Sequence, residues 1–174
     1  MVEWPAGTGP ATIDQAMVVF SLDDRRYALP LDRVQRSIRA VAITPLPQAP
    51  AIVIGILDLG GVVIPVIDIR GRFKHPPRDI RLSDHFIIAT AGKRTLALPV
   101  DRTTGVLEAS SEQRTPAGDI APRLELLNGT IQARDGLILI HDLERLLSLD
   151  EETGIDRALE SSSLAGDTSE GVGL

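Results

Sequence analysis

A short motif occurs twice in this chain. Residues 27–34 read YALPLDRV and residues 96–103 read LALPVDRT, so five positions are identical at an offset of 69. Further along, the offset becomes 74, where Gly55 corresponds to Gly129 and Asp68 to Asp142. A five-residue insertion in a loop of the second copy reconciles the two offsets. Because the matches keep their order and their strand-like context, they indicate an internal duplication, which constrains the fold to two similar units.

Short apolar runs separated by turn residues fill both copies. The pattern predicts strands at 17–22, 26–30, 38–44, 52–58, 62–68, 85–91, 94–100, 104–109, 126–132 and 137–141. Polar or glycine-containing turns at 23–26, 59–61 and 92–93 predict hairpins.

Prolines and short polar stretches punctuate this strand pattern. Residues 31–36 are compatible with a helical turn, and the three prolines between Thr44 and Pro50 exclude a regular element there. Pro65, inside a strand run, predicts an edge strand or a bulge, because proline donates no ladder hydrogen bond.

The duplicated strand pattern predicts an all-β fold with a few short helices, in which two similar five-stranded β-barrels pack side by side. Closing each sheet into a barrel removes its exposed edges. We expect a disordered leader at residues 1–15 and one domain at 16–150, with halves at approximately 16–81 and 82–150. Residues 151–174 are expected to form a short helix and a disordered tail.

Composition excludes several classes of protein. The chain has 174 residues, a formal net charge of −6 and no cysteine. The negative charge argues against a general nucleic-acid binder, and the missing thiols exclude disulfides and cysteine-based zinc sites. No run approaches the roughly 20 apolar residues that span a bilayer, and no signal-peptide pattern opens the chain. The sequence therefore predicts a cytoplasmic protein without direct membrane insertion.

No motif for catalysis, metal binding or cofactor binding is apparent. His75, His85 and His141 lack metal-ligand spacing, and no glycine-rich nucleotide fingerprint occurs. An aspartic-protease dyad is disfavoured because Asp58 falls on Gln132 in the second copy, while Asp68 and Asp142 have the positions of helix caps. We expect no catalytic residue, metal or cofactor, unless a composite site forms across a groove between the barrels.

A basic run is the strongest local charge feature, and it includes Arg70, Arg72, Lys74, Arg78 and Arg81. One interpretation is a solvated linker between the two halves. The alternative is an electrostatic contact for an acidic partner, which mainly sets association rate and orientation.

Several ordered motifs resemble the CheW-like family of chemotaxis coupling proteins over residues 17 to about 150. The most specific is the run at 55–69, GILDLGGVVIPVIDI, where the family pattern is close to G-apolar-apolar-Asn-Leu-Arg-Gly followed by Pro-apolar-apolar-Asp-Leu. Weaker matches are Tyr27-Ala28-Leu29, Val34-Gln35 and the closing segment 138–147. The resemblance implies two five-stranded, SH3-like barrels with a groove between them.

The resemblance also implies a function without catalysis. In the family, the protein is an adaptor that couples chemoreceptors to a CheA-type histidine kinase. Its expected partners are the regulatory domain of that kinase and the cytoplasmic tip of a methyl-accepting chemoreceptor, which recruit it to membrane arrays. The partner-binding positions implied for this chain are Val34, Gln35, Arg36, Asp58, Leu59, Gly60, Gly61, Leu98, Val100 and Val106.

Three of these positions depart from the family pattern. Asp58 and Gly60 stand where Asn and Arg are common, and Arg36 stands where Glu is common. Loss of an arginine removes a planar five-donor group, and Glu to Arg reverses a charge. These differences are either compensated nearby or mark an adaptor for a non-standard chemosensory cluster. The alternative function is thus a module that binds a kinase regulatory domain without conventional receptors.

Overall fold

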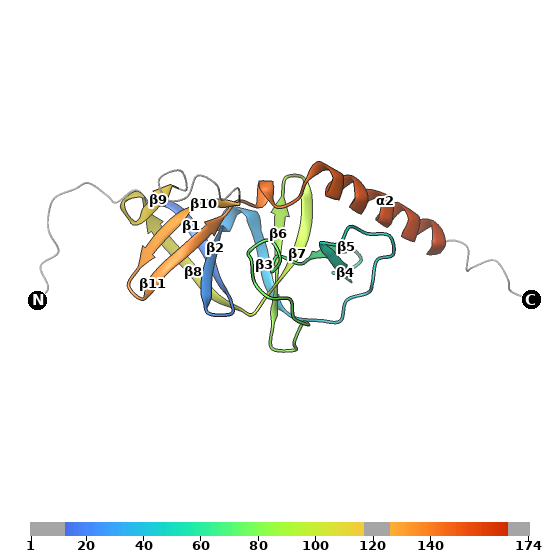
Figure 1. Cartoon of the computed structure of the whole chain (residues 1–174), viewed down its shortest axis with the longest axis horizontal. Helices are drawn as coiled ribbons and strands as arrows, with labels where there is room; N and C mark the ends of the chain where they lie inside the picture. The colour runs from blue at the N-terminus through green and yellow to red at the C-terminus, as the bar shows by residue number, and fades with distance from the viewer. Residues whose placement is uncertain (1–12, 117–125, 167–174) are drawn as a thin grey trace, which may run out of the picture.

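The computed structural model describes residues 13–116 and 126–166 (Figure 1). Its strands are β1 (Ile13–Leu22), β2 (Arg25–Pro30), β3 (Val34–Arg39), β4 (Val53–Asp58), β5 (Val63–Ile67), β6 (His85–Ala91), β7 (Arg94–Val100), β8 (Arg102–Ser110), β9 (Arg114–Pro116), β10 (Leu127–Ala133) and β11 (Gly136–His141). Three 3-10 turns, η1 (Leu31–Arg33), η2 (Ser111–Gln113) and η3 (Leu143–Arg145), and the helix α2 (Leu149–Gly166) complete these described segments.

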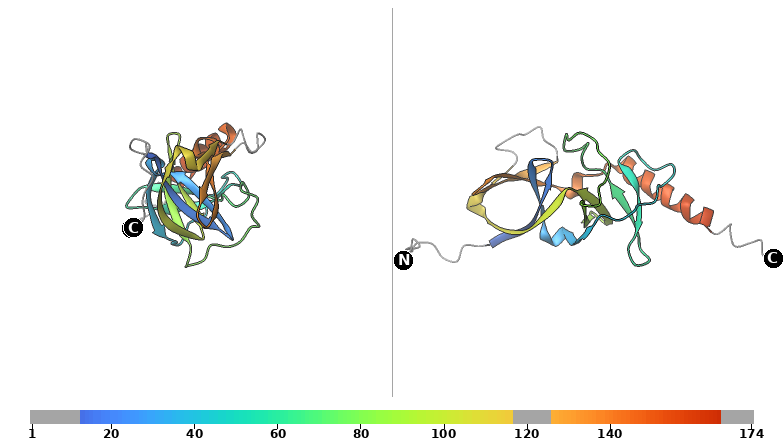
Figure 2. Two further views of the ribbon diagram at one scale, coloured as in Figure 1. Left: turned by 90° about the vertical axis from the view of Figure 1, so that its left-hand side faces the viewer. Right: turned by 90° about the horizontal axis from the view of Figure 1, so that it is seen from below.

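The strands form two sheets. Sheet A has the order β8-β1-β2-β11-β10-β9 and sheet B has the order β3-β6-β7-β5-β4. Each contains one parallel contact, β2 with β11 and β7 with β5, among antiparallel neighbours. The two curled sheets lie side by side along the long axis of the molecule (Figures 1 and 2). The predicted all-β, two-unit fold is confirmed.

The two sheets are copies of each other, but each draws on both halves of the sequence. At the offsets of 69 and 74, β1–β2 corresponds to β6–β7, β3 to β8, β4 to β10 and β5 to β11. Under this correspondence the strand orders match. Each copy nevertheless places its first hairpin in the sheet of the other copy. The expected halves 16–81 and 82–150 therefore do not coincide with the barrels, because the hairpins are exchanged.

A glycine bulge recurs at equivalent positions of the two sheets. The register shifts at Gly55 in β4 and at Gly129 in β10. A Cβ at Gly55 would lie 2.7 Å from the Thr44 carbonyl oxygen, and a Cβ at Gly129 would lie 2.7 Å from that of Thr115. Only glycine allows so close an approach of two backbones. The shared glycines thus have a packing cause.

The β1–β2 and β6–β7 hairpins are apolar on both faces because both faces are buried. Along β7, Leu96 and Leu98 face a central cluster between the barrels, whereas Ala97 faces the interior of the sheet B barrel. In β2, Leu29 joins the same central cluster, while Ala28 faces the interior of the sheet A barrel. Strands buried on both faces give continuous apolar runs rather than alternation. The exchanged hairpins therefore form the common wall of the two barrels.

Helix α2 is longer than the short helix expected beyond residue 150. A reciprocal cap starts it: Ser148 Oγ accepts from Glu151 N at 3.2 Å, and Glu151 Oε2 accepts from Ser148 N at 2.8 Å. Its own side chains Ile155 and Ala158 are buried, and the helix runs along the sheet B barrel (Figure 1). The expected tail is helical to Gly166, and residues 167–174 lie outside the described residues.

Other local expectations needed correction. β1 begins at Ile13, so the end of the expected leader 1–15 is strand, and residues 1–12 lie outside the described residues. The helical turn expected at 31–36 is limited to η1. Pro65 lies in an inner strand and not at an edge. A proline is tolerated there because β5 pairs with β7 at Val66, where no amide hydrogen of residue 65 is needed. In the ranges 13–116 and 126–166, no helix is long and apolar enough to cross a membrane.

Candidate partner-binding surface

Two outer strands carry four of the predicted partner-binding residues. Val34, Gln35 and Arg36 lie on β3, at one edge of sheet B, and Val106 lies on β8, at one edge of sheet A. The strands meet where Ser37 Oγ and Thr103 Oγ1 share a hydrogen bond of 2.8 Å. The structure thus joins β3 and β8, through side chains 66 positions apart, at the junction of the barrels.

The side chains on these strands offer an apolar and basic surface. Val106 is 59% exposed, and Gln35 and Arg36 are also exposed. Val34 is half-buried and packs against the central core. Gln35 Nε2 donates to Thr90 Oγ1 at 3.4 Å and to Thr95 Oγ1 at 3.3 Å, which orients its side chain.

The predicted turn of Asp58, Leu59, Gly60 and Gly61 is formed but lies on the β4–β5 hairpin, away from β3 in the strand order. Asp58 Oδ1 accepts from Gly61 N at 2.7 Å. Gly60 and Gly61 have φ values of +67° and +88°, the signs that a type I′ hairpin turn requires. Beyond the turn, Val62 and Val63 are 59% and 50% exposed. The hairpin therefore presents a rigid tip with an apolar flank.

Leu98 and Val100 do not belong to an accessible surface. Each side chain is 1% exposed and packs in the central cluster between the barrels. Both lie on β7, an inner strand of sheet B that is covered on both faces. Their predicted partner-binding role is corrected to a role in the core.

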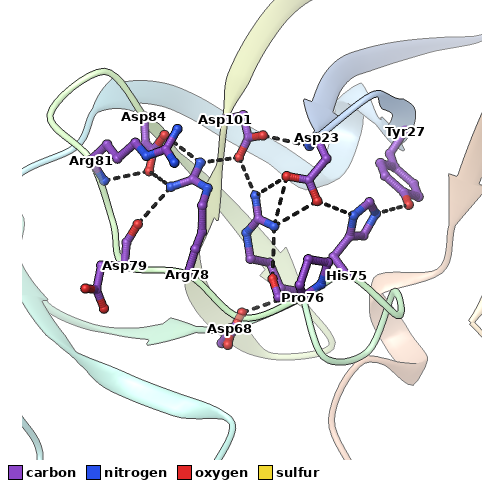
Figure 3. Close-up of polar contacts among 11 residues, drawn as sticks. Asp23, Tyr27, Asp68, His75, Pro76, Arg78, Asp79, Arg81, Asp84 and Asp101 are labelled. Carbon is purple, nitrogen blue, oxygen red and sulfur yellow. Dashed lines mark hydrogen bonds and ion pairs between the residues drawn. The ribbon is translucent and has the colours of Figure 1, made fainter.

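A partly buried ionic network, which the sequence did not reveal, connects the two barrels (Figure 3). Arg70, on the turn after β5, is 6% exposed. Its guanidinium donates to Asp23 in the β1–β2 turn at 3.1 Å and to Asp101 at the β7–β8 crossover at 2.8 Å. Asp23 N also donates to Asp101 Oδ2 at 2.7 Å. Three segments far apart in sequence are thereby held together.

The network extends on both sides of Arg70 (Figure 3). On one side, Arg78 makes a two-pronged contact with Asp84 at 2.8 and 2.9 Å and also pairs with Asp101. On the other side, His75 Nδ1 lies 2.8 Å from Asp23 Oδ2, and His75 Nε2 lies 2.5 Å from the Tyr27 hydroxyl. The two-pronged contact of Arg78 with Asp84 is of the charge-assisted, bidentate kind that is among the strong hydrogen bonds of proteins.

Titration behaviour follows from these contacts. Hydrogen bonds from Arg70 and then from His75 hold the pKa of Asp23 at about 2, below its ordinary value of 3.8. Burial alone would lower the pKa of Arg70, but its bonds to Asp23 and Asp101 outweigh burial, so the pKa is raised. The bond to Asp84 is the main cause of the raised pKa of Arg78. Asp23, Arg70 and Arg78 are therefore charged at neutral pH.

Three of the five cations of the basic run are bound to carboxylates of this chain, so the run as a whole is not a solvated linker. Arg70 and Arg78 are committed to internal carboxylates, and Arg72 pairs with Glu151 of α2. The two predicted caps hold this region in shape, because Asp68 Oδ1 accepts from Arg70 N at 2.9 Å and Asp142 Oδ1 accepts from Glu144 N at 2.9 Å. Asp68 caps a turn rather than a helix, and Asp142 begins η3.

The described side chains form no catalytic constellation that we recognise. Within residues 13–116 and 126–166, no group of three or more His, Asp or Glu side chains is arranged to hold a metal ion. Asp58, Asp68 and Asp142 each serve a separate turn. The junction and the β4–β5 tip carry exposed valines, Val106 on β8 and Val62 and Val63 beside the tip.

Comparison with known proteins agrees with this class. The family model described as a CheW-like domain matches residues 16–151. The chain is 28% identical to a chemotaxis protein CheW of Klebsiella aerogenes over 86% of this chain and 92% of the relative. It is 26% identical to a probable chemotaxis protein CheW of Rhizobium etli over 78% of this chain and 88% of the relative.

A solved structure is also similar to this chain. The crystal structure of the scaffolding protein TtCheW from Thermoanaerobacter tengcongensis superposes with a TM-score of 0.71 at 28% identity, covering 79% of this chain and 94% of that one. The double-barrel fold thus defines a scaffold of the chemotaxis coupling class. The chain belongs to the CheW-like family.

Proposed function

We propose that this protein is a non-enzymatic adaptor that couples chemoreceptors to a CheA-type histidine kinase. The observation that carries the proposal is the CheW-like domain over residues 16–151, folded as two barrels that a partly buried ionic network joins into one body. A rigid body transmits a partner's position without needing catalytic groups. Its partners are the regulatory domain of the kinase and the cytoplasmic tip of a methyl-accepting receptor, through which it is recruited to membrane arrays.

The partner surface that we propose consists of Val34, Gln35 and Arg36 on the edge strand β3, Val106 on the edge strand β8, and the tip of the β4–β5 hairpin from Asp58 to Gly61. The exposure of Val106, at 59%, supports its role as a central apolar contact. A receptor hairpin is a long pair of helices, and helices bind by laying an apolar stripe against such a surface.

Val106→Asp is expected to weaken binding to the receptor hairpin by about tenfold or more, because a charge replaces a central apolar contact. Calorimetric titration of the purified hairpin and of the kinase regulatory domain measures this effect. Leu137→Asp is the matched control, since Leu137 is 50% exposed on β11 of sheet A. Equal affinities of the two variants for both partners would remove Val106 from the proposed surface.

The departures at Arg36, Asp58 and Gly60 raise a second possibility, an adaptor of a non-standard cluster. We expect weak binding to a conventional receptor tip and tighter binding by Gly60→Arg. A Cβ at Gly60 meets nothing within 4 Å, but its φ of +67° costs an arginine roughly 1–2 kcal/mol of stability. Gly60→Asn is therefore the control, because asparagine tolerates this conformation. Strong wild-type binding that Gly60→Arg leaves unchanged would exclude the altered-partner hypothesis.

A further inference from the structure

A basic cleft of about 560 Å³ opens beside the barrel junction, between β2 and β11 of sheet A and the turn that follows β5. Four cationic side chains line it, those of Arg25, Arg72, Lys74 and Arg145. None of its described lining residues is acidic, although the chain as a whole carries a charge of −6. Its volume is within the roughly 300–1,000 Å³ range of small-molecule sites.

A buried histidine also lines this cleft. His141 is 8% exposed, and both of its ring nitrogens are buried without a hydrogen bond of regular geometry among the described residues. A buried polar group without a regular hydrogen bond costs about 1–3 kcal/mol, and both ring nitrogens are shielded from the cleft, so His141 forms part of its wall. Burial lowers the pKa of His141 to about 4, against a smaller raising effect from the Leu126 backbone. At neutral pH the ring therefore offers one donor and one acceptor.

The cations differ in how far their charges are already compensated. Arg72 pairs with Glu151, and Arg145 lies 3.6 Å from Asp142. In the described part of the chain, no ion pair joins Arg25 or Lys74 to a carboxylate. The cleft therefore keeps uncompensated positive charge at its rim.

The position of Lys74 is fixed by its backbone. Its φ is +62°, and the turn closes through a 2.9 Å hydrogen bond from His75 N to Arg70 O. The same turn places the Phe73 ring against His141, with ring centres 3.8 Å apart. Leu127 and Leu139 complete an apolar floor. Charge at the rim and apolar surface below it are thus built from ordered segments.

We propose that this cleft binds a small amphipathic anion, a carboxylate or phosphate carried on an apolar body. The anionic group contacts Arg25 and Lys74, and the apolar body covers Phe73 and Leu139. The site is separate from the proposed partner residues on β3, β8 and the β4–β5 tip. It would give the scaffold a small-molecule ligand in addition to its protein partners.

Calorimetry with four probes tests the proposal on the full-length protein. Decanoate and decyl phosphate carry both features, decyltrimethylammonium carries the apolar chain with a cationic head, and inorganic phosphate carries only the negative charge. We expect decanoate or decyl phosphate to bind one per chain, about tenfold or more tighter than either control probe. The relative affinities of the first two distinguish a carboxylate ligand from a phosphate ligand.

Matched charge reversals locate the site. Lys74→Glu is expected to weaken decanoate binding by about tenfold, because it replaces an attraction with a repulsion. Arg134→Glu changes the net charge equally at the exposed β10–β11 turn and should leave the affinity within about twofold. Equal affinities of Lys74→Glu and Arg134→Glu, equal binding of all four probes, or no binding at millimolar concentration would each overturn the proposal.

Discussion

Arg70→Met is expected to lower the free energy of unfolding by about 3 kcal/mol. Removing one partner of a buried ion pair typically costs about 3–5 kcal/mol, because the opposite charge is left unpaired. The lower end applies because Asp101 keeps Arg78 as a partner and Asp23, whose side chain is 40% exposed, can be hydrated. Chemical denaturation of the two proteins at neutral pH measures the difference.

The matched control for this prediction is Arg39→Met, since Arg39 is exposed on β3 and makes no ion pair among the described residues. We expect it to change stability by no more than about 0.5 kcal/mol. In the Arg70→Met background, Asp23→Asn should recover part of the loss, because it removes an unpaired charge. A loss for Arg70→Met as small as that for Arg39→Met would mean that the network does not hold the barrels together.

Leu98→Ala is expected to destabilise the protein by about 2–5 kcal/mol, as large-to-small changes in a packed core do. Leu98 is 1% exposed in the cluster that joins the two barrels. Val106→Ala, on an exposed position of β8, should cost no more than about 0.5 kcal/mol. Denaturation midpoints of the two variants test the correction that separates the core from the partner surface. A Leu98→Ala protein with near wild-type stability but lost partner binding would restore Leu98 to the surface.

Much of the fold was predictable because strand patterns and turn chemistry are local. The Gly60-Gly61 turn and the apolar run of β6 follow from a few neighbouring residues. The exchange of hairpins was not predictable in this way. Because β1–β2 and β6–β7 are copies, the local pattern does not say which sheet each of them joins; that choice depends on pairing across the chain.

The candidate site was predictable only in part. The family pattern identified Val34 and Val106, which the structure places on neighbouring edges, but it also pointed to the buried Leu98. The ionic network could not be predicted from local sequence, because Asp23 and Asp101 are 78 residues apart. By contrast, α2 had a readable signal, since Ser148 and Glu151 have the spacing of a capping box. The serine-rich stretch that begins at Ser161 is typical of a disordered tail, although the helix continues through it to Gly166.

The most direct measurement of the central claim is a three-component assembly experiment. Purified receptor hairpin, kinase and this protein from the same cell are mixed, and the receptor is sedimented or captured. We expect the kinase to be recovered with the receptor only when this protein is present, and we expect Val106→Asp to lower the recovery while Leu137→Asp does not. Recovery of the kinase to the same extent without this protein, or no recovery with it, would contradict the coupling function.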